Sequence, residues 1–144
     1  MASAASLSDP TARVHKGFHV SLWVVQILLA ALFGMAGVMK TTTPIAELIT
    51  KLPWAGAIPE ALVRFIGASE LAAAFGLILP SATRIRPALT PLAAAGLALV
   101  MALAFVFHVA RGETQALPIN LVLGGLAAFV AWGRAKKAPI SARA

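Results

Sequence analysis

Residues 88–110 read ALTPLAAAGLALVMALAFVFHVA, a run that contains no Asp, Glu, Lys or Arg. A helix needs about 20 predominantly apolar residues to cross the hydrocarbon core of a bilayer. A helix that is apolar on every face is buried in a large protein core or in a membrane. The stretch therefore predicts a membrane-spanning helix, and the rest of the chain decides how many helices accompany it.

The composition of the whole chain supports the same class. Of its 144 residues, 60% are hydrophobic and 12% are charged, and the mean hydropathy is +0.88. Soluble domains carry roughly 45–50% apolar and about 25% charged residues. This chain has too few charges to cover a water-facing surface, which excludes an ordinary soluble enzyme, a disordered chain and a coiled coil.

Three further apolar runs accompany the first. Phe18 to Met39 is too long for the apolar region of a signal peptide, which is roughly 7–15 residues, and therefore predicts a retained helix. Ala61 to Pro80, interrupted by Arg64 and Glu70, and Ala116 to Gly133 complete the set. We expect an all-α integral membrane four-helix bundle.

The link between the first two spans, Thr41 to Glu60, is long enough for a short helix of its own. Apolar residues recur in it at helical spacing, at Ile45, Leu48, Ile49 and Leu52. Thr43 is the expected N-cap, with Pro44 at the first helical position, and Trp54 suits the headgroup zone. The pattern predicts a short amphipathic helix lying in the membrane interface.

The charges are divided between the two sides of the predicted spans. One side carries Arg13, Lys16, Arg84, Arg86, Arg134, Lys136, Lys137 and Arg143, opposed only by Asp9. The other side carries Lys40, Lys51, Arg64 and Arg111 with Glu47, Glu60, Glu70 and Glu113. The positive-inside rule then predicts a multi-pass protein of the cell inner membrane with both termini in the cytoplasm.

This sidedness divides the chain into three parts. We expect a cytoplasmic N-terminal segment at residues 1–17, a four-span membrane domain at 18–133 and a basic cytoplasmic tail at 134–144. The net charge of +7 predicts contact with anionic lipids at the cytoplasmic face rather than with nucleic acid, because the charges lie between long apolar runs.

Small residues four apart let helix backbones approach closely in lipid. They occur in the third span and in the fourth, at Ala94, Ala98, Ala102, Gly124 and Ala128. Two interpretations remain, which are packing within one bundle and a homodimer face.

No thiol chemistry or haem site is expected. The chain has no cysteine, which excludes disulfides and thiolate metal sites. His15 and His19 lie four apart on one helix, so they cannot ligate opposite faces of a haem, and they lack a nearby third ligand for zinc. We therefore predict no metal site and no intrinsic cofactor.

Five polar residues fall in the outer half of the predicted bilayer, and every span contributes at least one. They are Lys40, Arg64, Glu70, His108 and Asn120. Ionisable groups inside lipid are costly and are functional candidates by default. Lys40 is the expected partner of Glu70, since Arg64 lies about 120° away around the same helix. The cluster is interpreted either as a structural ion pair and hydrogen-bond network, or as a pocket for a ligand or redox partner, and no catalytic residue is assigned.

The second span also carries a family motif. Gly67-Ala68-Ser69-Glu70-Leu71, followed by Gly76-Leu77-Ile78-Leu79-Pro80, resembles the signature second helix of the DoxX and DoxX-like family. Gly37-Val38-Met39-Lys40 resembles the end of that family's first helix, and His108 and Asn120 fall where related members often carry polar residues. The resemblance covers residues 20–133 and implies a small four-helix membrane protein.

The resemblance implies several roles. Family members include a subunit of a thiosulfate:quinone oxidoreductase and membrane partners of oxidative-stress enzymes, and a related branch includes the NACHO receptor chaperone. A chain without cysteine cannot carry sulfur on a thiol of its own, so a thiosulfate role would need another subunit. The quinone link suits a lipophilic pocket near Lys40, Glu70 and His108.

Three functions are therefore weighed. The first is binding of a quinone or another lipophilic molecule by a protein that is non-enzymatic alone, or an accessory subunit of a quinone-linked oxidoreductase. The second is a membrane-protein assembly factor or structural complex subunit, with other membrane proteins as partners. The third is a small transporter or proton path through Glu70 and His108. Such a path would need further polar residues in the cytoplasmic half of the spans, where the sequence shows only Gln26.

Overall fold

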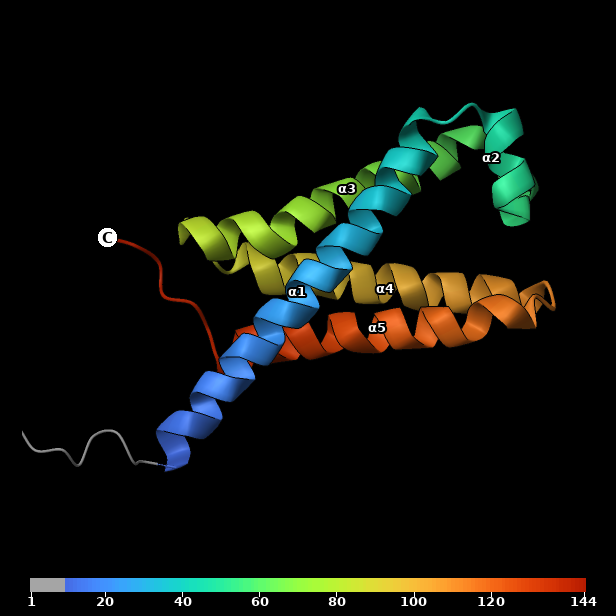
Figure 1. Cartoon of the computed structure of the whole chain (residues 1–144). Helices are drawn as coiled ribbons and strands as arrows, with labels where there is room; N and C mark the ends of the chain where they lie inside the picture. The colour runs from blue at the N-terminus through green and yellow to red at the C-terminus, as the bar shows by residue number, and fades with distance from the viewer. Residues whose placement is uncertain (1–9) are drawn as a thin grey trace, which may run out of the picture.

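The computed structural model describes residues 10–144, with side chains from residue 15 onward, and four long helices dominate it (Figure 1). They are α1 (Pro10–Thr42), α3 (Glu60–Thr83), α4 (Leu89–Ala110) and α5 (Leu117–Trp132). Each lies in a segment long and apolar enough to cross a membrane. The expected all-α four-helix membrane bundle is confirmed.

The helices extend beyond some of the predicted spans. α1 begins at Pro10, ahead of Phe18, because helical hydrogen bonds need no apolar side chains once the helix has formed. α3 continues past Pro80 to Thr83, and its C-cap, Arg84, takes a left-handed conformation with φ 61°. Residues 1–9 of the expected N-terminal segment lie outside the described residues.

The link between α1 and α3 forms two short helices, α2 (Ile45–Lys51) and the 3-10 helix η2 (Pro53–Ala57). The short helix was predicted, but the expected N-cap was wrong. Pro44 is the cap, and its carbonyl accepts a hydrogen bond from the N–H of Leu48 at 2.9 Å. Thr43 lies one residue before the cap, and its N–H bonds to the carbonyl of Met39 in the last turn of α1, at 3.1 Å.

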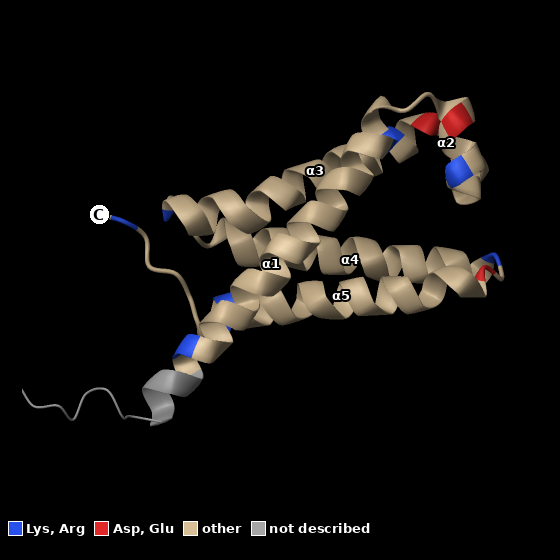
Figure 2. Ribbon diagram, viewed as in Figure 1, with Lys and Arg blue, Asp and Glu red and all other residues tan. Residues whose placement is uncertain are grey.

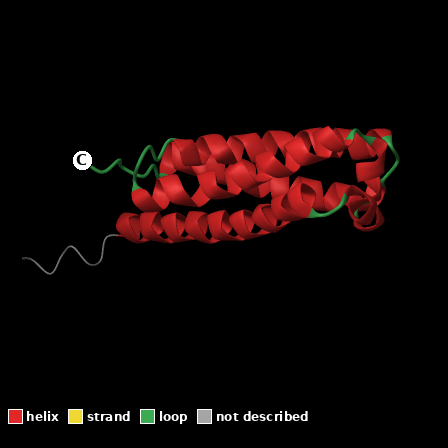
Figure 3. Ribbon diagram, turned by 90° about the horizontal axis from the view of Figure 1, so that it is seen from above, coloured by secondary structure: helices red, strands yellow, loops and turns green. Residues whose placement is uncertain are grey.

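Loops gather at the two ends of the bundle (Figure 3). The end that carries α2, η2 and the 3-10 helix η3 (Thr114–Ala116) is called the cavity end. The opposite end carries the α3–α4 connection, the π-helix η4 (Gly133–Lys137) and the C-terminus (Figure 1), and is called the basic end. α1 packs mainly on α3 and α4 mainly on α5, and the two pairs diverge toward the cavity end (Figure 1).

Apolar side chains fill the space between the pairs. The buried core consists of Leu22, Leu29, Phe33, Leu77, Ala94, Leu97, Met101, Ala127 and Val130. Small residues contribute to this packing within the bundle. A Cβ atom on Gly124 would lie 3.1 Å from the Cβ of Met101, so Gly124 lets α5 approach α4 closely.

Candidate functional site

Two glycines bring α1 and α3 close together at the cavity end. A Cβ atom on Gly67 would lie 2.6 Å from the Cβ of Lys40, and one on Gly37 would lie 2.7 Å from the carbonyl oxygen of Gly67. Neither distance leaves room for a methyl group. The glycines therefore set the spacing of the helices, and this spacing places the side chain of Lys40 beside that of Glu70.

Lys40 and Glu70 form a buried ion pair. The Lys40 Nζ atom donates to both carboxylate oxygens of Glu70, at 2.7 and 2.9 Å. The two residues are 7% and 3% exposed, so both charges are withdrawn from solvent. The expected pairing is confirmed, and each group supplies the counter-charge that the other needs in a low-dielectric setting.

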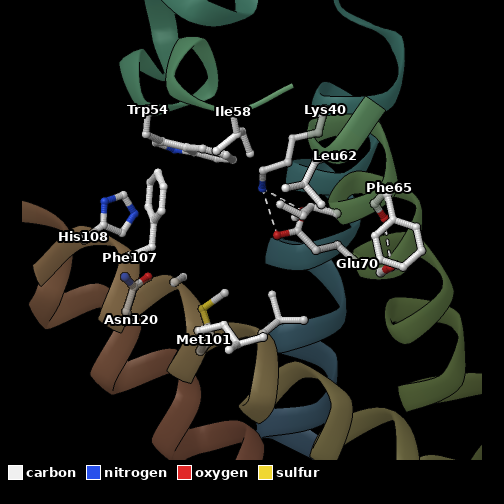
Figure 4. A pocket seen from close by; sticks show the side chains of 15 residues that line it. Lys40, Trp54, Ile58, Leu62, Phe65, Glu70, Met101, Phe107, His108 and Asn120 are labelled. Atoms are coloured by element: carbon white, nitrogen blue, oxygen red, sulfur yellow. Dashed lines mark hydrogen bonds and ion pairs between the residues drawn. The ribbon is translucent and has the colours of Figure 1, made fainter. Parts of the chain in front are cut away.

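A cavity of about 440 Å³ lies where the helix pairs diverge (Figure 4). Its polar lining consists of Lys40, Ser69, Glu70, His108 and Asn120. The rest of the lining is apolar or aromatic and includes Trp54, Leu62, Phe65, Met101 and Phe107. The cavity thus joins four of the five polar residues predicted from the sequence.

Trp54 covers the cavity from η2 (Figure 4). Its ring packs edge-to-face against Phe107 and His108, at centroid distances of 6.5 and 6.4 Å. The Lys40 Nζ atom lies 5.9 Å from the centroid of the Trp54 ring. Sequence reasoning assigned Trp54 only to the headgroup zone, because nothing local shows that η2 folds back over the helices.

Glu113 orients His108. The Nδ1 atom of His108 lies 2.6 Å from Glu113 Oε2, and Arg111 Nε donates to Glu113 Oε1 at 2.7 Å. These hydrogen bonds from His108 and Arg111 lower the pKa of Glu113 below its usual value. An ionised carboxylate can only accept hydrogen bonds, so Nδ1 carries the hydrogen and a neutral His108 keeps Nε2 as an acceptor.

Asn120 lies beside His108, opposite the Lys40–Glu70 pair (Figure 4). The residue is 8% exposed, and its Nδ2 atom has no hydrogen-bond partner among the described residues. A buried donor without a partner costs about 1–3 kcal/mol. The Nδ2 atom of Asn120 is therefore an unused hydrogen-bond donor buried beside the cavity, in largely apolar surroundings.

Arg64 is the predicted residue that does not line the cavity. Its Nη1 atom donates to the carbonyls of Lys40 and Thr43, at 2.7 and 2.8 Å, and its Nη2 atom pairs with Glu60 at 2.9 Å. The last carbonyls of a helix have no intrahelical partners. Arg64 thus caps the end of α1 and holds it against α3.

The basic end also contains buried polar groups. Gln26 donates from Nε2 to the carbonyl of Leu77 at 2.6 Å, and this hydrogen bond joins α1 to α3. The expectation that this half shows only Gln26 was wrong. Arg134 is buried there as well, and Ser81 donates to Thr90 at 2.8 Å. The error arose because Arg134 was assigned to the basic cytoplasmic tail at 134–144, beyond the fourth span.

A metal ion does not suit these groups. Within the part of the chain that the structure describes, no three His, Asp or Glu side chains converge in a way that could hold a metal ion. The cavity instead combines a few polar side chains with a largely apolar lining.

Comparison with known protein families identifies the family of the segment that forms the cavity. The model of the DoxX-like family matches residues 24–130, which include every polar residue of the cavity. Searches of curated proteins and of solved structures each gave no match. The family match covers well over half of the chain, and the chain therefore belongs to the DoxX-like family.

Proposed function

We propose that this integral membrane protein binds a lipophilic, oxygen-bearing molecule such as a quinone in its cavity, as an accessory to a membrane redox complex. The observation that carries the proposal is the Nδ2 atom of Asn120, a buried donor without a partner among the described residues. A ligand oxygen that accepts this hydrogen bond would remove the cost of leaving the donor unpaired.

The neighbouring groups favour an oxygen head on an apolar body. A carbonyl oxygen can accept from Asn120, and a hydroxyl group can also donate to Nε2 of a neutral His108. The aromatic and aliphatic walls suit a ring or chain. A volume of about 440 Å³ lies within the range of roughly 300–1,000 Å³ typical of small-molecule sites.

Access from the bilayer supports a lipophilic ligand. Phe65 of α3 and Leu103 of α4 both line the cavity, yet they are 67% and 61% exposed on the surface that lipid would cover. Trp54 covers the end of the cavity that faces the aqueous side. A molecule dissolved in the membrane would therefore enter sideways between α3 and α4.

The charge distribution supports a location in the inner membrane with the basic end in the cytoplasm. Lys and Arg lie at both ends of the bundle, whereas the acidic residues that the structure describes lie in its cavity-end half (Figure 2). The positive-inside rule places the basic end in the cytoplasm. The cavity then lies in the outer leaflet.

A second candidate is a structural subunit or assembly factor. The ion pair of Lys40 and Glu70 is complete without any ligand and bonds α1 to α3. In this alternative the polar cluster stabilises the bundle, and the function lies on helix faces that contact other membrane proteins.

Fluorescence quenching tests the ligand proposal. Trp54 lines the cavity, whereas Trp23 and Trp132 lie toward the basic end. We expect decylubiquinone to quench the tryptophan fluorescence of the protein saturably in lipid nanodiscs. Trp54→Phe is expected to remove the saturable part of this quenching. Asn120→Leu is expected to weaken apparent binding about tenfold, which corresponds to a loss of about 1.4 kcal/mol.

Thr90→Val is the matched control, since Thr90 is a buried polar residue away from the cavity. It is expected to bind like the wild type. Quenching that does not saturate, or that is unchanged in Asn120→Leu, would contradict a quinone site in this cavity.

A further inference from the structure

Arg134 is buried at the basic end, in the turn that follows α5. The residue is 3% exposed. A Cβ atom on the preceding Gly133 would lie 2.6 Å from Leu22 Cδ2, so η4 packs closely against α1. This close contact brings the guanidinium of Arg134 to the side of α1.

The groups that meet this guanidinium are neutral. Its Nε atom donates to Gln26 Oε1 at 2.5 Å, and its Nη1 atom lies 3.0 Å from His19 Nδ1 and 3.3 Å from the carbonyl oxygen of Ala138. The ring of Trp23 lies 5.3 Å from the Arg134 Cζ atom. The Nη2 atom is buried and has no hydrogen-bond partner among the described residues.

The contact with His19 is weaker than its distance indicates. The Trp23 indole N–H points at His19 Nε2, at 3.2 Å, while Arg134 points at Nδ1. A neutral imidazole has only one acceptor nitrogen. His19 therefore cannot accept from both donors, and Arg134 competes with Trp23 for it.

No carboxylate side chain among the described residues lies near Arg134. Those residues carry Glu47, Glu60, Glu70 and Glu113 as their acids, and all four belong to the cavity-end half of the bundle. The charged side chains that the structure describes at the basic end are cations, among them Arg84, Arg86, Lys136, Lys137 and Arg143. An arginine side chain stays protonated in proteins, and burying it without a counter-charge is costly.

We propose that Arg134 is the receptor for a phosphate group, supplied by an anionic phospholipid of the leaflet next to the basic end. A guanidinium binds phosphate oxygens through two parallel N–H donors, and the Nη2 donors of Arg134 are unused. Basic pockets between membrane helices bind anionic headgroups in this way.

The tail leaves a route to this site. The carbonyl of Ala138 accepts the longest of the guanidinium's hydrogen bonds, at 3.3 Å, and so occupies an Nη1 donor that a phosphate oxygen could take beside Nη2. Residues 138–144 form no helix or strand. The tail is held by a hydrogen bond from Arg84 Nε to the carbonyl of Ser141 and by one from the Arg143 N–H to the carbonyl of Arg84, both 3.0 Å long. A phospholipid would displace Ala138 while this distal attachment stays in place.

Lipid binding by the full-length protein tests the proposal. Native mass spectrometry from mild detergent, with titrated phosphatidylglycerol, gives an apparent Kd for the first bound lipid. We expect Arg134→Gln to weaken it about tenfold, a change of about 1.4 kcal/mol. Lys136→Gln removes the same charge from an exposed neighbour and is expected to leave the Kd within about twofold. Equal weakening in both variants would overturn the proposal, because it would indicate diffuse charge attraction.

Further measurements identify the source of the phosphate, and a second variant replaces Arg134→Gln if that variant does not fold. Phosphatidylcholine is expected to bind weakly, and inorganic phosphate is expected not to compete at millimolar concentration. Competition by inorganic phosphate would contradict a lipid source. If Arg134→Gln fails to fold by circular dichroism, Arg134→Lys retains the charge without the forked donors and is expected to bind measurably more weakly than wild type. Wild-type affinity in Arg134→Lys would contradict the proposed geometry.

The last control tests whether Asp9 supplies the counter-charge of Arg134. Asp9 lies outside the described residues. If a double-mutant cycle in thermal unfolding shows strong coupling between Asp9→Asn and Arg134→Gln, the counter-charge is internal and the lipid proposal is overturned.

Discussion

At the scale of single residues, Lys40 and Glu70 each depend on the other. Either charge alone would be stranded in a low-dielectric interior, and breaking a buried pair by removing one partner typically costs about 3–5 kcal/mol. Replacing both partners by apolar groups of similar volume is often neutral. The pair therefore stabilises the contact of α1 with α3 only as a unit.

A double-mutant cycle measures this dependence. We expect Lys40→Met and Glu70→Leu each to lower the free energy of unfolding by about 3–5 kcal/mol, and the double variant to recover most of the loss. Unfolding in mixed micelles with increasing sodium dodecyl sulfate, followed by circular dichroism, gives the values. Additive losses in the double variant would show that the two side chains do not act as a pair.

The contact between Glu113 and His108 makes stability depend on pH. Hydrogen bonds from His108 and Arg111 lower the pKa of Glu113 in the folded protein. The unfolded chain then binds more protons in this range, so the stability due to Glu113 is present above its ordinary pKa of about 4.3 and is lost as pH falls through the lowered value. We expect the Tm of the wild type to fall toward that of Glu113→Gln as the pH is lowered from 6 to 3. A difference in Tm that does not change over this range would contradict the contact.

The sequence predicts which polar residues of the spans line the cavity better than it predicts the residues that contact them. Lys40, Glu70, His108 and Asn120 stand out because polar residues are rare in apolar spans, and helical rise places them at one depth. Trp54 and Glu113 lie in connections, where no periodicity shows which way a side chain turns. Arg64 was grouped with the cavity by depth alone, whereas its direction around α3 leads it to the end of α1.

At the scale of elements, the contact between α1 and α3 depends on Gly37 and Gly67. Lipid offers helices no hydrophobic driving force for association, so close packing and interhelical polar contacts decide which faces meet. Hydropathy predicts that α1 and α3 span the membrane. It carries no information on their crossing, which small residues and the ion pair determine together.

Substitution of Gly67 tests this contact. A Cβ atom there would lie 2.6 Å from the Cβ of Lys40 and would push the helices apart. We expect Gly67→Ala to lower the free energy of unfolding by about 1–3 kcal/mol. Gly96→Ala is the control, since no atom lies within 4 Å of its Cβ position, and it is expected to be neutral or stabilising by up to about 1 kcal/mol. Equal stability of the two variants in thermal unfolding would contradict the proposed role of Gly67.

At the scale of the whole molecule, an apolar layer separates two polar regions. Leu29, Phe33 and Leu97 are buried between Gln26 at one end and Glu70 at the other. A proton path would need polar groups across this layer. The arrangement therefore favours a binding cavity in one leaflet over a transporter, although the basic end contains more polar groups than the sequence indicated.

Topology is testable because the chain has no cysteine of its own. We expect Ser141→Cys, at the basic end, to resist a membrane-impermeant maleimide in intact cells and to react after the membrane is opened. Thr114→Cys, at the cavity end, is expected to react in intact cells once the outer envelope is permeable. The reverse pattern would show that the cavity faces the cytoplasm.

Native mass spectrometry of the purified protein beside Asn120→Leu and Thr90→Val tests whether the cavity binds a lipophilic molecule. We expect a non-covalent adduct of a small lipophilic molecule on the wild type and on Thr90→Val, and its loss in Asn120→Leu. An adduct that persists unchanged in Asn120→Leu, or wild-type protein that carries none in its native membrane extract, would show that the cavity is not the binding site.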